Sequence, residues 1–180
     1  MQLVRKSAGA LMGRKLAEVR YYEIPFGLTE DRRWERDLAH LVDYGLDLVT
    51  DQGTFAVTWT AQEAVGYRID CTPGPLLDRR LDRVQVSHVE DAEPWSSSVG
   101  SVVETVAVHE SFSSSFGEQW VRFPLALTIK FTTGQTICLV FGSWHGVDKA
   151  IFPTGNDIVI IWKRESVPIL LPFLAGEIQL

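Results

Sequence analysis

Three histidines are the residues of this chain best suited to proton transfer or metal binding. His88 and His109 each lie close to a carboxylate, in the segments SHVED and VHESF, and His145 lies in the segment GSWHG. If the strands that carry His88 and His109 are neighbours, their imidazoles and Glu90 or Glu110 could together ligate a metal ion. Neither HxH nor HExxH occurs, however, so the spacing itself indicates no metal. We therefore predict no metal site and no cofactor, and we keep His88, His109 and His145 as candidate catalytic residues.

The segment GSWHG resembles the nucleophile elbow of hydrolases, but its order of residues is wrong. The elbow needs one residue between the glycine and the serine, whereas Ser143 follows Gly142 directly. The glycines of the chain form neither a GxGxxG motif nor a Walker loop, so no cradle for nucleotide phosphates is indicated. The sequence therefore favours a protein that is not an enzyme, with an enzyme as the open alternative.

Acidic and aromatic residues in predicted loops are the candidates for binding a partner. The predicted binding residues are Glu90, Asp91, Glu93, Trp95, Trp144 and His145. Clustered carboxylates attract a basic surface and speed its association. A large aromatic residue in a loop has two uses, because it either covers the core as a lid or anchors a partner. Together these residues predict an acidic and aromatic rim.

The charge balance bears on the class of partner. The 180 residues include 17 Lys and Arg and 23 Asp and Glu, which gives a net charge of −6. Nucleic-acid binding needs a basic surface that neutralises phosphates. We therefore predict no nucleic-acid partner, and we expect a protein partner with a basic surface. The oligomeric state stays open.

Three further features bear on location in the cell. The most apolar segment, VPILLPFLAG at 167–176, is about half as long as the roughly 20 residues of a membrane helix. The apolar run at 8–13 is shorter than the core of a typical signal peptide. Cys71 and Cys138 belong to no CxxC pair, so we expect buried free thiols in a reducing compartment. These features predict a cytoplasmic protein that does not enter a membrane.

The elements that must position these residues are mostly strands, because apolar and polar residues alternate with a period of two. Two segments, LDLVTDQGTFAVTW and IKFTTGQTICLVF, read as hairpins with a glycine at the turn, Gly53 in the first and Gly134 in the second. The residues expected to share one interior are Phe55, Val57, Ile129 and Leu139. The segment 40–49 is expected to form one strand whose Asp43 and Asp47 face solvent.

The remaining elements follow from the same patterns. Further strands are expected at 17–24, 65–70, 83–89, 102–110 and 157–163, the last covered on both faces. Loops are expected at 71–80, 90–98, 111–119 and 142–156, and short helical turns at 30–38 and 95–103. The prediction is a single domain over 1–180, mainly β, forming an antiparallel sandwich or rolled barrel of about eight to ten strands with one or two short helices. Two similar halves, about 16–70 and 95–163, suggest an internal duplication.

Four strings carry a resemblance that covers most of the chain. They are LMGRKLAEVRYYEI, YGLDLVTDQGTFAVTW, FPLALTIKFTTGQTICLVF and GNDIVIIW. This strand-and-turn texture resembles that of small uncharacterised bacterial β-rich proteins, among them candidate immunity partners of toxins. The resemblance implies a bacterial protein-binding module that is not an enzyme, and it supplies no catalytic residues. The alternative hypothesis is a small-ligand-binding protein or enzyme with a cavity in the β-roll and His88, His109 or His145 at work in it.

Overall fold

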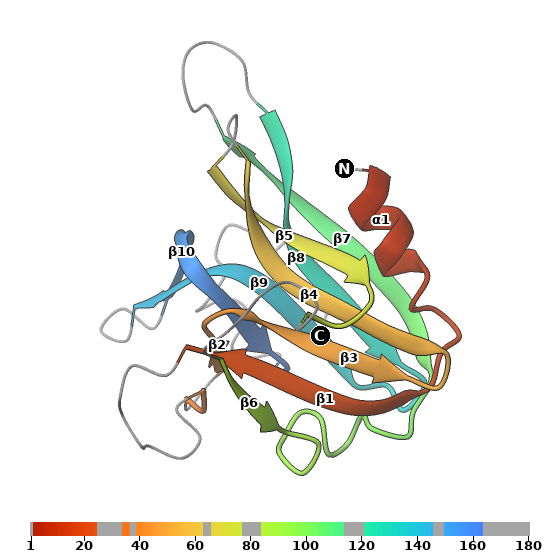
Figure 1. The fold of residues 1–180 in the computed structure, drawn as a ribbon. Helices are drawn as coiled ribbons and strands as arrows, with labels where there is room; N and C mark the ends of the chain where they lie inside the picture. Colours follow the sequence, from red (N-terminus) through yellow and green to blue (C-terminus); the bar gives the residue numbers. More distant parts are fainter. Residues whose placement is uncertain are drawn as a thin grey trace.

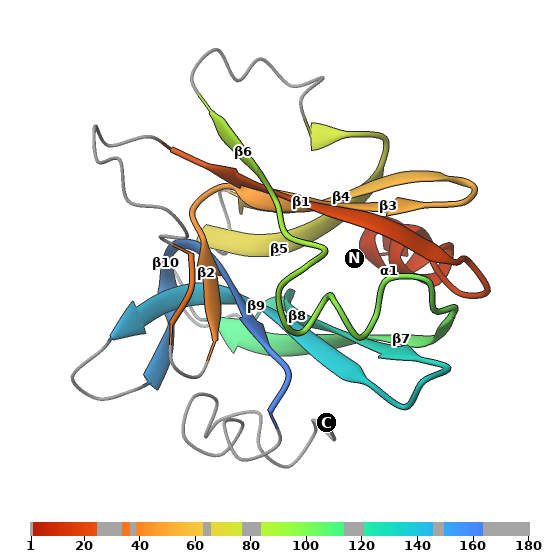
Figure 2. The ribbon, with the colours of Figure 1, turned by 90° about the horizontal axis from the view of Figure 1, so that it is seen from below.

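The described part of the chain is mainly β, with one short helix and two five-stranded antiparallel sheets packed as a sandwich (Figures 1 and 2). The structure is a computed structural model that describes residues 2–24, 34–36, 39–62, 66–76, 84–113, 121–145 and 150–163. The two sheets do not close into a barrel. Of the two predicted arrangements, the sandwich is therefore confirmed.

The first sheet has the strand order β5-β4-β3-β1-β6. Its strands are β1 (Leu16–Glu23), β3 (Gly45–Thr50), β4 (Gly53–Gln62), β5 (Gly66–Pro73) and β6 (Gln85–His88). Strands β1, β3, β4 and β5 form a meander, and β6 is added beside β1. The edge strand beside β1 is therefore β6, which comes from later in the chain than the meander.

The second sheet has the strand order β2-β10-β9-β8-β7. Its strands are β2 (His40–Val42), β7 (Val103–Ser113), β8 (Val121–Phe131), β9 (Thr136–His145) and β10 (Ala150–Ile161). Here β7 to β10 form the meander, and β2 pairs with β10. Each predicted half thus supplies one meander, while β2, from the first half, joins the second sheet. The duplication of the halves stays a prediction.

The prediction of one continuous strand at 40–49 is wrong. Strand β2 ends at Val42 and β3 begins at Gly45, and the two strands belong to different sheets. The chain bends between them at Asp43 and Tyr44. The apolar alternation survives this bend, since Val42 and Leu46 are both fully buried in the common core. Periodicity alone therefore could not reveal where the strand breaks.

The two predicted hairpins bury one common interior, as expected. Phe55 and Val57 of β4 and Ile129 and Leu139 of β8 and β9 all belong to one buried cluster. Both turn glycines have a positive φ, which an L side chain rarely adopts. Two sheet faces packed in this way exclude water from both apolar sets at once.

Strand β10 is covered on both faces, as its sequence predicted. Its four residues from Ile158 to Ile161 are all fully buried, and the strand lies between β2 and β9. The predicted loop at 142–156 is wrong, however, because β9 continues to His145 and β10 begins at Ala150. The register shifts between Phe152 and Asp157. Such an irregularity accommodates proline and glycine inside a strand, which explains why this stretch reads as a loop.

The helix α1 (Gln2–Gly9) was not predicted. Its signal is the spacing of Val4, Ala8 and Leu11, which are all buried; Val4 and Ala8 lie on one face of the helix, and Leu11 lies in the turn that follows it. Figure 1 shows α1 beside β5 and β7. The helical turn expected at 95–103 is instead a series of turns through Gly100, and the one expected at 30–38 lies mostly outside the described residues. No helix in the described ranges is long and apolar enough to cross a bilayer.

Cys71 and Cys138 are buried free thiols, as expected. They lie in different sheets, on β5 and β9. Burial raises the pKa of each thiol to about 12. Both side chains therefore remain protonated at neutral pH and act as small apolar residues.

Replacement of Gly45 by alanine tests the close approach of β3 to β4. A Cβ at Gly45 would lie 2.5 Å from the carbonyl oxygen of Val57, whereas a Cβ at Gly100 would meet nothing within 4 Å. Both glycines have a positive φ, so Gly100→Ala isolates the backbone strain. We expect Gly100→Ala to lower the free energy of unfolding by about 1–2 kcal/mol, and Gly45→Ala by about 2 kcal/mol more. If urea unfolding gives equal losses of free energy for the two variants, the close contact between Gly45 and Val57 is contradicted.

Candidate functional site

A depression opens at the edge of the sandwich beside β2 and the segment that follows β6. Its volume is about 550 Å³. It is lined by Glu35, Arg36, His40, Asp91, Ala92, Glu93, Trp162 and Lys163. Figure 2 shows the segment after β6 crossing from the first sheet to the second at this edge. The depression therefore lies between one wall from β2 and the end of β10 and another from the segment that follows β6.

A chain of buried hydrogen bonds lies behind this depression. The indole Nε1–H of Trp95 donates to the hydroxyl oxygen of Tyr21, and that hydroxyl lies 2.9 Å from Nδ1 of His40. All three side chains are almost completely buried. Burial raises the pKa of Tyr21 well above its usual value, so the hydroxyl keeps its proton. The Tyr21 hydroxyl thus joins the indole N–H of Trp95 on one side to Nδ1 of His40 on the other.

Aromatic rings hold His40 from two sides. The ring centroid of Trp34 lies 4.5 Å and that of Trp162 lies 4.7 Å from the centroid of His40, both edge to face. Tyr21 also meets His40 and Trp34 edge to face. The rings come from β1, from β2 and from segments beside β2 and β10, so the cluster joins both sheets. His40 is consequently fixed in one orientation at the wall of the depression.

The rim of the depression carries more acid than base. Three of the lining residues are acidic, Glu35, Asp91 and Glu93, and two are basic, Arg36 and Lys163. The acids are exposed. The Lys163 ammonium lies 5.6 Å from the ring centroid of Trp162, which is a cation–π distance. An aromatic wall with acids beside it suits a cationic group.

The segment after β6 is held in place from inside. The backbone N–H of Trp95 donates to the carbonyl of Ala92 at 2.8 Å, and the hydroxyl of Ser97 donates to Glu93 at 3.1 Å. The Trp95 ring itself is fully buried under the loop. Of the two uses expected for an aromatic residue in a loop, Trp95 has the first, since it covers the core. It supports the acidic loop from inside and does not itself reach the surface.

Sequence reasoning thus placed the acidic loop correctly at an exposed position. Asp91 and Glu93 line the depression, and Glu90 is exposed in the same turn. Trp144 and His145 lie in β9, and their side chains fall outside the part of the chain that the structure describes.

The other two predicted histidines are not brought together. His88 ends β6 at one edge of the first sheet, and His109 lies in β7 at an edge of the second. His88 Nδ1 lies 2.7 Å from a carboxylate oxygen of Glu18, whereas His109 Nε2 lies 2.7 Å from the hydroxyl of Thr128. The two-imidazole metal arrangement is therefore wrong, because the strands of His88 and His109 do not pair.

His40 is the histidine that sequence reasoning missed. It lies two residues before the buried Val42, so the period of two places both side chains on the interior face. That position is the signal that could have identified it. Tyr21 lies 19 residues before His40, and Trp95 lies 74 residues after Tyr21. No local pattern therefore relates the three residues.

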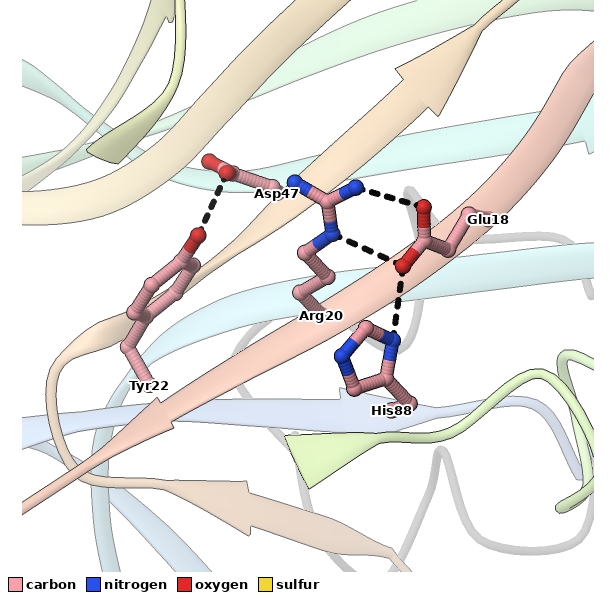
Figure 3. Close-up of polar contacts among 5 residues, drawn as sticks. All are labelled: Glu18, Arg20, Tyr22, Asp47 and His88. Atoms are coloured by element: carbon pink, nitrogen blue, oxygen red, sulfur yellow. Dashed lines mark hydrogen bonds and ion pairs between the residues drawn. The ribbon is translucent and has the colours of Figure 1, made fainter. Parts of the chain in front are cut away.

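Asp47 is also misplaced by the sequence, which assigned it to solvent. It is fully buried on the outer face of β3. One carboxylate oxygen accepts from the Tyr22 hydroxyl at 2.6 Å and the other from the Leu76 backbone N–H at 3.0 Å (Figure 3 draws the first). Tyr22, Ala56 and Leu76 form a small apolar cluster there. Burial in this cluster raises the pKa of Asp47.

In comparisons with known proteins, no family model, no curated protein and no solved structure matches this chain.

Replacement of Tyr21 by phenylalanine tests the buried hydrogen bonds that join Trp95, Tyr21 and His40. The change leaves the Trp95 indole N–H without its acceptor and His40 Nδ1 without the Tyr21 hydroxyl as partner. Each buried polar group that loses its partner costs about 1–3 kcal/mol, so for two groups we expect the free energy of unfolding to fall by about 2–6 kcal/mol. Tyr44→Phe, at a half-buried position on the other side of the sheet, is the matched control. If urea unfolding shows a loss of free energy no larger than that of the control, the buried hydrogen bonds of Tyr21 are contradicted.

Asp157 provides a test by pH. Burial, and next the negative charge of Asp43, raise the pKa of Asp157 to about 6, while Arg36 opposes the shift. A raised folded-state pKa favours the protonated fold, so stability from this group is full below the unfolded pKa and is lost as pH rises through about 6. We expect Asp157→Asn to be more stable than wild type at pH 8, by a margin that shrinks at pH 5. An equal margin at both pH values in urea unfolding, with wild type as reference, would contradict this assignment.

Proposed function

We propose that the protein is a non-enzymatic interaction module that binds a protein partner through the depression at the sandwich edge, with a Lys or Arg side chain of a basic partner seated against Trp162. The observation that carries this proposal is the combination of an aromatic wall, His40 and Trp162, with the exposed acids Asp91 and Glu93 in one depression. Such a pocket offers one anchor point within a larger contact.

The chemistry of the wall supports a cationic side chain as the anchor. Trp162 already has the Lys163 ammonium near its ring, so its face accepts positive charge. A partner guanidinium is planar, stacks on indole and forms two hydrogen bonds with a carboxylate. Glu93 and Asp91 are close enough to the wall to line the same depression. Carboxylates around the rim would also attract a basic surface before contact.

The alternative function, a ligand site or catalytic centre built on the predicted histidines, has less support. His88 and His109 lie in different sheets. The space between the sheets is filled by buried apolar residues from both of them. His40 does line the depression, but its Nδ1 is engaged by Tyr21 and its ring is fixed by two tryptophans. A histidine held in this way is suited to shaping a wall more than to shuttling protons.

The proposal extends to the setting of the protein. Its two buried free thiols suit a reducing cytoplasm. The resemblance in texture to bacterial immunity candidates suggests that the partner is a basic toxin-like protein encoded beside it. The loop after β6 would then be the part that determines the partner.

Two charge reversals at matched positions test this function. Glu93→Lys alters the rim of the depression, and Glu104→Lys alters β7, where Glu104 forms an exposed ion pair with Lys130. Both changes shift the net charge equally, so only the local effect differs. The probes are the purified products of the two genes that flank its own, measured by calorimetry at low and physiological salt.

We expect Glu93→Lys to raise the Kd at least about tenfold and Glu104→Lys to change it less than about threefold, because only Glu93 lies at the contact. The affinity of the wild type should fall as salt increases. Equal effects of the two variants, or no binding of either product, would contradict the proposal.

A further inference from the structure

A second group of polar side chains lies on the outer face of the first sheet, away from the depression. Figure 3 shows Glu18 and Arg20 of β1 and His88 of β6 side by side. Arg20 donates to both oxygens of Glu18, at 2.8 and 2.6 Å, and His88 Nδ1 lies 2.7 Å from one of those oxygens. Glu90 completes the group, since one ligand atom each from Glu18, His88 and Glu90 lie within 4.8 Å of one another.

Strand pairing explains how these residues meet. Arg20 lies directly opposite His88 in the antiparallel pair of β1 and β6. Glu18 precedes Arg20 by two residues in β1, so these two side chains share one face, and Glu90 follows His88 by two residues in the turn after β6. The hydrogen bond from the Val89 N–H to the Val19 carbonyl continues the pairing past the end of β6. Two carboxylates are thereby brought together across the strands, and the Arg20 guanidinium is paired with one of them.

We propose that Glu18, His88 and Glu90 form a surface site for a divalent first-row transition-metal ion, with Zn²⁺ as its simplest occupant. Three protein ligands at Zn–N and Zn–O distances of about 2.0–2.2 Å require ligand atoms about 3.3–3.5 Å apart in a tetrahedron. The three ligand atoms lie within 4.8 Å of one another, so binding requires side-chain rotations that bring them to this spacing. The remaining coordination positions face solvent and take water.

Arg20 positions the first ligand. Each oxygen of Glu18 accepts one hydrogen bond from the guanidinium, which leaves a second lone pair on each oxygen. The lone pair that now faces His88 Nδ1 is the one that a metal would take. Metal-binding carboxylates are commonly oriented by such a neighbouring donor. The positive charge of Arg20 also reduces the net charge of the ligand set to −1, so the site favours moderate affinity.

The donor set selects the class of ion. An imidazole nitrogen favours Zn²⁺ and its transition-metal neighbours over Ca²⁺ and Mg²⁺, which prefer oxygen ligands. No thiolate takes part, because Cys71 and Cys138 are buried elsewhere. Two carboxylates with one histidine are therefore suited to a borderline divalent ion.

A bound ion would connect β1 to the end of β6 and to the acidic loop that begins at Glu90. That loop continues to Asp91 and Glu93 at the depression, so the ion would restrain one side of it. The site itself needs no partner protein and lies on a different face, and its occupancy is measured without one. Failure of the metal test therefore leaves the binding function standing, and failure of the binding test leaves the metal site standing.

The test titrates the folded, metal-stripped protein with Zn²⁺ by calorimetry and with Co²⁺ by its visible absorption. We expect one equivalent of each ion to bind, and a rise in Tm with Zn²⁺. His88→Ala and Glu90→Gln should each weaken Zn²⁺ binding more than about tenfold and abolish the rise in Tm. The control Glu104→Gln removes an exposed carboxylate on β7 and should leave binding unchanged within about twofold.

His88 is 59% exposed, so its replacement is compatible with folding, and Glu90→Gln gives an independent variant of similar size. Circular dichroism and Tm without metal verify the fold of each. The proposal is overturned if wild type binds no Zn²⁺ at micromolar concentrations, or if His88→Ala binds it with unchanged stoichiometry and affinity.

Discussion

Burial of the inward faces of two sheets against each other is the constraint that determines the rest of this structure. Each sheet carries an apolar face that is stable only when a second sheet covers it, and the two meanders supply those faces. A sandwich of this kind leaves its edges open, since the sheets do not close. Strand β6 pairs with β1 at the edge of the first sheet, and β2 pairs with β10 at the edge of the second. The depression lies beside β2 and the segment after β6, and the ligand set of the metal proposal lies on the outer face of the first sheet.

The open edge creates a physical problem that the buried aromatic cluster solves. Tyr21 and Trp95 carry polar atoms into a region without water, and each of those atoms needs a partner. The hydrogen bonds of Tyr21 with Trp95 and with His40 satisfy them in one series that crosses from one sheet to the other. The same series fixes the wall of the depression. Stability and the shape of the binding surface therefore depend on the same contacts.

The outer face of the first sheet shows how side-chain burial on a strand depends on what lies over it. Glu18 and Arg20 remain partly exposed and pair with each other, and hydrogen bonds from Arg20 lower the pKa of Glu18. Asp47, on the neighbouring β3, is covered by the segment around Leu76 and becomes fully buried. A face that reads as uniformly polar is thus divided into a buried part and an open part. The open part contains the ligand set of the metal proposal.

The sequence by itself determined the strand character of the chain, the two glycine turns and the shared interior of Phe55, Val57, Ile129 and Leu139. These are local properties, because alternation with a period of two and positive φ at a turn are written within a few residues. It also marked the loop of Asp91 and Glu93, since a run of acids stays in water. Only the tertiary structure decided that 40–49 divides between two sheets, that His40 meets Tyr21 and Trp95, and that Asp47 is buried. The tertiary structure also decided between the sandwich and the barrel. Each of those outcomes depends on which distant strands pair and what covers them, and the free energy of that choice comes from the whole core and not from any one segment.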